Sequence, residues 1–172
     1  VITADGVNLE YEVFNKEDGE MYFNLGTHPA FMASEFPVTD YYLEFSEPET
    51  LDLYTLVGLT VAKETKPYLK NEKVIKITED LFKDDALVFK GHKSEYLSLK
   101  NVNNSEEVKV SLKDFTWLGI WAPPGAPFVC LEPWCGVADM EDHNGDLTKK
   151  EAVNKLEKGG SFKRVMEIIV NK

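Results

Sequence analysis

The sequence predicts an all-β protein built as an antiparallel β-sandwich, and three observations support this prediction. Apolar residues alternate with polar ones or form short runs rich in Val, Ile, Phe and Tyr, which is the pattern of half-buried and buried strands. Turn-forming residues separate these runs, for example at residues 101–104 and 123–125. No segment shows two clean turns of amphipathic helical period. A sheet sandwich or barrel accounts for all three.

Strand-like segments follow one another along the chain. Residues 79–83 can close a single helical turn and residues 149–158 have a helix-forming composition, but neither has the period of a stable amphipathic helix. No repeat or flexible linker divides the chain, so we expect residues 1–172 to form a single β-sandwich domain. We expect strands at residues 9–14, 21–25, 41–45, 60–62, 87–90, 96–99, 108–112, 117–121, 128–131 and 163–170.

Composition excludes several classes of protein. Hydrophobic residues make up 43% and charged residues 28% of the chain, which is ordinary globular usage and argues against disorder. The net charge of −11 repels phosphate backbones and anionic lipids, so nucleic acids and membrane surfaces are not expected partners. Neither a signal peptide nor a membrane-spanning stretch is recognisable, and we therefore expect a cytoplasmic protein.

The sequence predicts no metal site. Cys130 and Cys135 lie in or beside an apolar run with a spacing that fits zinc poorly, so we interpret both as buried thiols. Residues 142–146 look like the start of a calcium loop, but Leu147 occupies the position where such a loop needs glycine. Signatures of nucleotide binding, serine hydrolases and zinc proteases are also absent from the sequence.

His28 is one of three histidines and the most unusual of them. It lies between Gly26 and Pro29, where an apolar strand ends and the backbone is restricted, so its imidazole would be held at the edge of a sheet. From the residues alone, a catalytic histidine and a structural histidine satisfied by hydrogen bonds fit equally well. His92 and His143 lie in polar, turn-like segments, and we expect both at the surface.

Glu132 follows the apolar run 128–131 and precedes Pro133 and Trp134. A carboxylate at the end of a buried strand is unfavourable unless it is paired or used in chemistry. The residues alone slightly favour a strand-end side chain that turns to solvent. An imidazole and a carboxylate beside aromatic residues are nevertheless the groups that acid and base catalysis on a sugar hemiacetal requires.

Two long segments resemble the motifs of the aldose 1-epimerase family, in particular its bacterial LacX-like branch. They are MYFNLGTHPAF at residues 21–31 and PFVCLEPWCGVAD at residues 127–139. Residues 85–90, 118–121 and 145–162 are similar in the same order, so the resemblance covers essentially the whole chain. It implies a galactose mutarotase-like β-sandwich, or supersandwich, that needs no cofactor and no metal.

The resemblance also implies a reaction and its residues. The family interconverts the α and β anomers of a free hexose, with a histidine as general acid and a glutamate as general base, and these roles carry over to His28 and Glu132. We expect Trp121 or Trp134 to stack on a sugar face and Asp85 to hold a hydroxyl, with core packing as the role of at least one tryptophan. Cys135 and Val137 stand where the family usually has an aromatic residue and an arginine, so sugar contacts near that loop should differ.

The resemblance further implies that an amino-terminal segment is missing, because family members are longer and bring a further histidine from that part. A partial sandwich has exposed strand edges, so we expect self-association or pairing with another chain. Two alternatives to the mutarotase stay open. One is a carbohydrate-binding β-sandwich module without catalysis, and the other is a hexose-phosphate mutarotase, which the single arginine, Arg164, disfavours.

Overall fold

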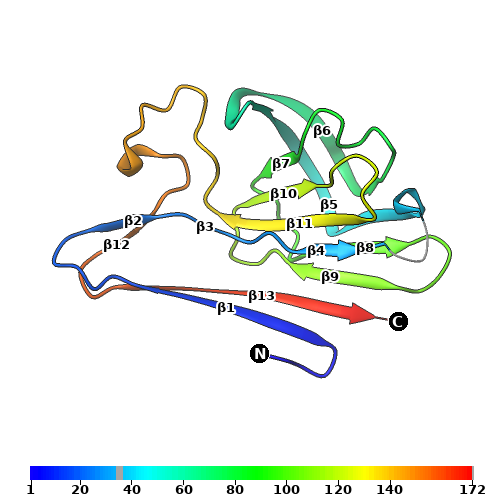
Figure 1. Ribbon diagram of the computed structural model, residues 1–172, viewed down its shortest axis with the longest axis horizontal. Helices are drawn as coiled ribbons and strands as arrows, with labels where there is room; N and C mark the ends of the chain where they lie inside the picture. Colours follow the sequence, from blue (N-terminus) through cyan, green and yellow to red (C-terminus); the bar gives the residue numbers. More distant parts are fainter. Residues whose placement is uncertain (34–36, 172) are drawn as a thin grey trace.

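Antiparallel strands make up nearly all of the regular structure. The computed structural model describes residues 1–33 and 37–171, and Figure 1 shows a curled sheet from which a two-stranded arm extends. Two short 3-10 helices, η1 (Val38–Asp40) and η2 (Leu147–Lys149), interrupt the strands. The strands are β1 (Gly6–Phe14), β2 (Met21–Phe23), β3 (Leu25–Gly26), β4 (Ala30–Met32), β5 (Tyr41–Val57), β6 (Thr60–Lys76), β7 (Leu87–Lys90), β8 (Tyr96–Asn101), β9 (Glu107–Ser111), β10 (Trp117–Trp121), β11 (Phe128–Cys135), β12 (Asn154–Leu156) and β13 (Ser161–Asn171).

Eleven of these strands form one sheet in the order β1-β13-β9-β8-β5-β7-β10-β11-β3. Strand β4 also pairs with β11, strand β6 pairs with β5, and β2 and β12 form a separate ribbon. This architecture confirms the predicted all-β antiparallel fold class. No helix in the described part of the chain has the length and apolar character that crossing a membrane requires.

Strands β5 and β6 are much longer than the sequence predicted. They run over Tyr41–Val57 and Thr60–Lys76, whereas the sequence predicted only residues 41–45 and 60–62. Among the strands, β6 pairs with β5 alone, and on its other edge a single bridge joins Val61 to Met140. Many of its charged side chains therefore face solvent. A strand at an exposed edge does not need an apolar face, and the alternating pattern that reveals strands is therefore lost.

The helix-forming composition of residues 149–158 does not produce a helix. The segment leaves η2, turns, and forms β12, which pairs with β2. The Asn154 side chain donates a hydrogen bond to the carbonyl oxygen of Phe23 at 3.2 Å, which ties this segment to a distant strand. Tertiary contacts here override the local propensity.

The register of β7, β10 and β11 positions the candidate site. Val88, Gly119 and Glu132 lie side by side across these three strands. Since side chains alternate along a strand, Leu118 and Ile120 point to the opposite face, where they are buried in the main core. The face that carries Glu132 is separate from the main core.

A smaller apolar cluster lies on the Glu132 face. Its buried members are Val61, Val88, Trp117 and Val137, and Trp134 packs against them while remaining partly exposed. This face therefore has a packed apolar floor next to the carboxylate.

Two histidines that the sequence placed at the surface are more enclosed, and this prediction was wrong. Both ring nitrogens of His92 are buried, and burial lowers the pKa of its imidazole. The His143 side chain is only 8% exposed and lies 3.5 Å from the Asp139 carboxylate. Polar neighbours in a sequence indicate a turn, but they do not show whether the turn folds back over the sheet.

Candidate functional site

His28 lies in a short break between two strands that both pair with β11. Strand β3 pairs with Trp134 and Cys135, and β4 pairs with residues 128–130, so the connecting residues 27–29 run beside the middle of β11. Buried Thr27 anchors this loop, because its backbone N–H and its hydroxyl both donate to the carbonyl oxygen of Pro133, at 3.1 and 3.0 Å. The loop is thereby fixed over the position of Glu132.

Glu132 is buried in the middle of β11, contrary to the reading that a strand-end glutamate turns to solvent. The Nε2 atom of His28 lies 3.4 Å from Oε1 of Glu132, and the two side chains are 60% and 5% exposed. The structure thus brings the predicted acid and base together, with the carboxylate at the bottom and the imidazole toward solvent. Their catalytic roles stay predictions.

The electrostatics of the pair are set mainly by burial. Burial raises the pKa of Glu132 above its usual value, while His28 and the indole N–H of Trp134 act in the opposite direction by favouring the carboxylate. A carboxylate in such surroundings is a stronger base than one in water. It can therefore accept a proton from a weakly acidic hydroxyl group more readily.

Trp134 lies along the sheet next to Glu132, and two glycines make room for it. Its Nε1 donates to the carbonyl oxygen of Thr27 at 3.1 Å, which fixes the orientation of the ring. A side chain at Gly119 would lie 2.4 Å from the indole, and one at Gly26 would lie 2.9 Å from it. The ring can occupy this position only because both residues lack a Cβ atom.

Trp121 borders the pair on the side of β10. Its ring centre lies 6.3 Å from that of His28, with the two ring planes perpendicular. Trp117, in contrast, is buried, so the expected core-packing role falls to this tryptophan. Trp121 and Trp134 are only partly buried, and they border His28 and Glu132, respectively.

Asp85 is the least well placed of the predicted residues. It precedes β7, has a positive φ of 91°, and accepts a hydrogen bond from the N–H of Ala86 through its own side chain. Among the residues that the structure describes, no hydrogen bond or ion pair joins Asp85 to His28 or Glu132. Its proposed contact with a sugar hydroxyl stays a prediction.

Cys130 is a site residue that sequence reasoning did not identify as one. Both cysteines are free and buried, which confirms that part of the prediction. Cys130, however, lies two residues before Glu132 and faces the same side, and burial, followed by the Glu132 charge, raises the pKa of its thiol to about 11. The two-residue spacing was the available signal, but an apolar run does not reveal which residues face a site.

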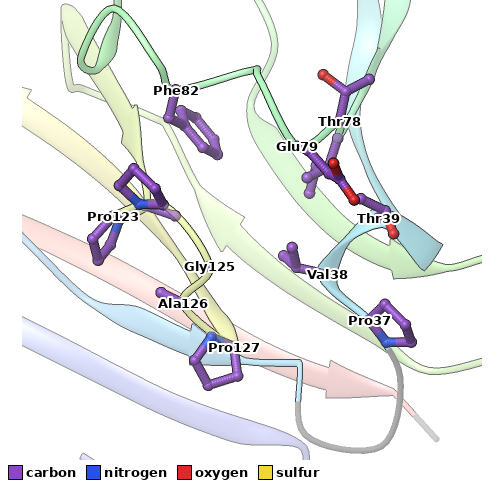
Figure 2. Close-up of a pocket in the computed structure, with 13 residues that line it drawn as sticks. Pro37, Val38, Thr39, Thr78, Glu79, Phe82, Pro123, Gly125, Ala126 and Pro127 are labelled. Atoms are coloured by element: carbon purple, nitrogen blue, oxygen red, sulfur yellow. The ribbon is translucent and has the colours of Figure 1, made fainter.

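Two hollows lie near this region. A shallow one of about 280 Å³ borders the site beside Trp134 and is lined by Asn24, Leu25, Gly26, Trp134, Gly136, Val137 and Ala138. A second pocket, of about 480 Å³, is shown in Figure 2, where Pro37 and Val38 face Ala126 and Pro127 across it. Neither hollow is lined by His28 or Glu132 themselves. The shallow one shares Trp134, which lies next to Glu132 on the same face of β11, so the open face beside Trp134 is the candidate binding surface.

Comparison with known proteins identifies similar chains, although no family model matches this sequence. The plasmid and chromosomal LacX proteins of Lactococcus lactis are each 30% identical over 166 residues, which cover 91% of this chain and 56% of the relative. This chain therefore spans only about half the length of the curated relatives it matches.

Two solved structures have closely similar folds. A galactose mutarotase related enzyme from Lactobacillus acidophilus is 28% identical, with a TM-score of 0.89 over 99% of this chain and 59% of that one. A galactose mutarotase-like protein from Lactobacillus casei has the same TM-score at 21% identity, covering 98% of this chain and 60% of that one. The second likeness shows the fold alone, while the first and the LacX relatives also share sequence.

Proposed function

Because the chain belongs to the LacX-like branch of the aldose 1-epimerase family, we propose that it is a mutarotase of a free hexose. The observation that carries this proposal is the pairing of an exposed imidazole, His28, with a buried carboxylate, Glu132, at 3.4 Å. An acid and a base this close can serve two oxygens bonded to one carbon, as in a cyclic hemiacetal.

The proposed reaction consists of two proton transfers and one rotation. Ionised Glu132 accepts the proton of the anomeric hydroxyl, while protonated His28 donates one to the ring oxygen, so the ring opens to an aldehyde. Rotation about the bond next to the carbonyl presents its other face. Reversal of both proton transfers then closes the ring as the other anomer. Positioning supplies much of the rate enhancement, because both groups are held beside the same carbon.

The flanking residues support binding of a neutral sugar. Trp121 and Trp134 offer aromatic surfaces for the apolar face of a pyranose, and the shallow hollow beside Trp134 offers room for it. We assign Asp85 to a hydroxyl contact, because Leu87 pairs with Ile120 and Asp85 therefore precedes the end of β7 that lies beside Trp121.

Polarimetry of freshly dissolved α-glucose and α-galactose tests the proposal. We expect the chain to accelerate the change in optical rotation, and His28→Ala and Glu132→Gln each to slow this reaction by roughly 10² to 10⁴ fold. The exposed Glu17→Gln variant is the matched control and should retain the full rate. A well-folded wild-type chain without any acceleration would contradict a mutarotase contained in these residues.

A carbohydrate-binding module without catalysis is the second candidate. It is favoured by one observation, that the chain spans 56% of its curated relatives, so a whole relative holds residues that this chain does not match. Calorimetry with the same sugars measures binding, and together with polarimetry it separates the two functions. Binding without acceleration indicates the module, and acceleration lost in both variants indicates the enzyme. Hexose phosphates in the same assays test the phosphorylated alternative.

A further inference from the structure

Three different metal-ligating groups meet at the centre of the site. A ring nitrogen of His28, the Sγ atom of Cys130 and a carboxylate oxygen of Glu132 all lie within 4.8 Å of one another. The proposed sugar reaction uses the imidazole and the carboxylate but has no role for the thiol. The thiol therefore needs a separate explanation.

The backbone projects two of these groups from one face of a strand, and the third reaches them from a loop. Cys130 and Glu132 are two residues apart on β11, so their side chains project from the same face. Strand β11 is fixed at Cys130 from both sides, by Trp121 of β10 and Ala30 of β4. The His28 side chain is 60% exposed and can rotate toward the other two.

The spacing is close to that of a tetrahedral zinc site. Zinc bonds to sulfur at roughly 2.3 Å and to nitrogen or oxygen at roughly 2.0 to 2.2 Å, so neighbouring ligand atoms are about 3.3 to 3.8 Å apart. The 3.4 Å between His28 Nε2 and Glu132 Oε1 already lies in this range. The remaining distances, from Cys130 Sγ to the other two atoms, need to close by at most about 1.5 Å. Rotation of the exposed imidazole closes the first, and a change in the side-chain torsions of Cys130 and Glu132 closes the second.

The chemistry of the ligands selects the kind of metal. Calcium and magnesium prefer oxygen ligands throughout, whereas a thiolate, an imidazole and a carboxylate together suit zinc and similar transition metals. We propose that His28, Cys130 and Glu132 bind a thiophilic divalent cation such as Zn²⁺, with the fourth position open to solvent. This inference departs from the sequence-based expectation that the chain has no metal site.

Binding has a chemical consequence at each ligand. The S–H bond of Cys130 breaks, a sulfur–metal bond forms, and the proton is released to solvent. Because the metal occupies both His28 and Glu132, it blocks the proposed acid and base, so Zn²⁺ acts as an inhibitor that excludes the sugar. This last consequence rests on the proposed function, but the binding itself does not.

Titration of the chain with Co²⁺ in the absence of sugar tests the site. We expect one equivalent to produce a thiolate-to-cobalt absorption band in the near ultraviolet, together with the intense visible bands of four-coordinate cobalt, and Zn²⁺ to abolish both. Cys130→Ala should lose the near-ultraviolet band, because this band arises from the thiolate. His28→Ala should lose the tight one-to-one binding, because one of the three ligands is removed. Cys135→Ala is the matched control and should retain both, because Cys135 is buried in the main core.

The outcomes separate the metal site from the sugar reaction. His28 is exposed, so His28→Ala reports on the ligand even if Cys130→Ala unfolds, and circular dichroism checks the fold of each variant. A folded wild-type chain without a cobalt band, or a band that persists in folded Cys130→Ala, overturns the metal site. A chain that binds Co²⁺ but does not accelerate mutarotation in its metal-free form overturns the proposed enzyme and leaves the metal site intact.

Discussion

Glu132 shows how a candidate catalytic residue can oppose stability. Its side chain is 5% exposed, and burial raises the pKa of its carboxyl group above the usual value of 4.5. Between the usual and the raised pKa the folded chain binds more protons than the unfolded chain, so the free energy of unfolding falls as pH rises through this window. Above it, the ionised carboxylate destabilises the fold.

Replacing this carboxylate should therefore stabilise the protein at neutral pH. We expect Glu132→Gln to raise the free energy of unfolding at pH 7 by about 1 kcal/mol and to flatten its decrease as pH rises above 4.5. Urea unfolding at pH 5 and pH 7.5 measures both effects, with exposed Glu17→Gln as the control. A Glu132→Gln chain that is less stable than wild type at pH 7.5 would show that His28 and Trp134 fully compensate the cost of burying the Glu132 charge.

Gly119 should be needed for the position of Trp134. A methyl group there would meet the indole at 2.4 Å, so Gly119→Ala must displace the ring from Glu132. We expect a loss of about 1 to 3 kcal/mol in stability, a change in tryptophan fluorescence, and at least a roughly tenfold slower mutarotation. Gly19→Ala has open space around it and should leave all three properties unchanged. Normal activity in Gly119→Ala would show that the position of Trp134 is not needed for mutarotation.

The Cys130 thiol should be unreactive in the folded chain. With a pKa of about 11, its thiolate makes up about one part in a thousand at pH 8, and alkylation should be roughly a hundredfold slower than for an ordinary thiol. Mass spectrometry after timed treatment with iodoacetamide measures this rate at Cys130 separately from Cys135. The urea-unfolded chain is the control. Rapid labelling of Cys130 in folded protein would refute the description of Cys130 as a buried thiol with a raised pKa.

At the scale of strands, apolar burial decides what the sequence reveals. The bounds of β7 and β10 agree with the prediction, because both are short apolar runs in the middle of the sheet. Most of β6 was missed because an edge strand tolerates charge, and β12 was missed because its pairing with β2 is a tertiary contact. Local sequence contains neither kind of information.

The candidate site was only partly predictable for a related reason. The residues alone left His28 undecided and favoured an exposed Glu132, and the family resemblance singled out both. Their 3.4 Å contact depends on a break between β3 and β4 that lies beside β11, a register that strand patterns do not specify. The third group, Cys130, was hidden because a fully apolar run does not show its two faces.

The loop between β3 and β4 should depend on one hydroxyl group. Thr27→Val keeps the shape of the side chain but removes its buried hydrogen bond to the Pro133 carbonyl oxygen. We expect a loss of about 1 kcal/mol and slower mutarotation, because the loop that holds His28 loosens. Thr60→Val removes a similar bond at an exposed turn, to Val57, and should have a smaller effect on stability and none on activity. Equal effects in chemical unfolding would exclude this anchoring role.

At the scale of the whole molecule, the sheet has free edges and a strongly negative charge. Strand β1 is the last strand at one end of the sheet, and an isolated bridge between Ile2 and Val7 covers part of its outer edge. It pairs with β13 to form the arm in Figure 1, and β13 joins the rest of the sheet through β9. Apolar Phe14 and Val165 are exposed on this arm, at 52% and 43%. Exposed edges favour pairing between copies, whereas the net charge of −11 opposes it.

We therefore propose that the chain self-associates through the β1 edge and that salt promotes this association. Raising ionic strength to about 0.15 M and beyond shortens the range of charge repulsion to roughly 8 Å or less, so larger species should appear with salt and with protein concentration. Phe14→Lys should weaken this association at least tenfold, because a lysine on an edge strand opposes pairing.

Sedimentation velocity at low and high salt measures this self-association. Val102→Lys is the matched control, because Val102 is 63% exposed and lies outside the strands, and it changes the net charge by the same amount as Phe14→Lys. Association that weakens equally in both variants would indicate a general effect of charge. A wild-type chain that stays monomeric at every salt and protein concentration would mean that the β1 edge is protected by its own twist and charged side chains.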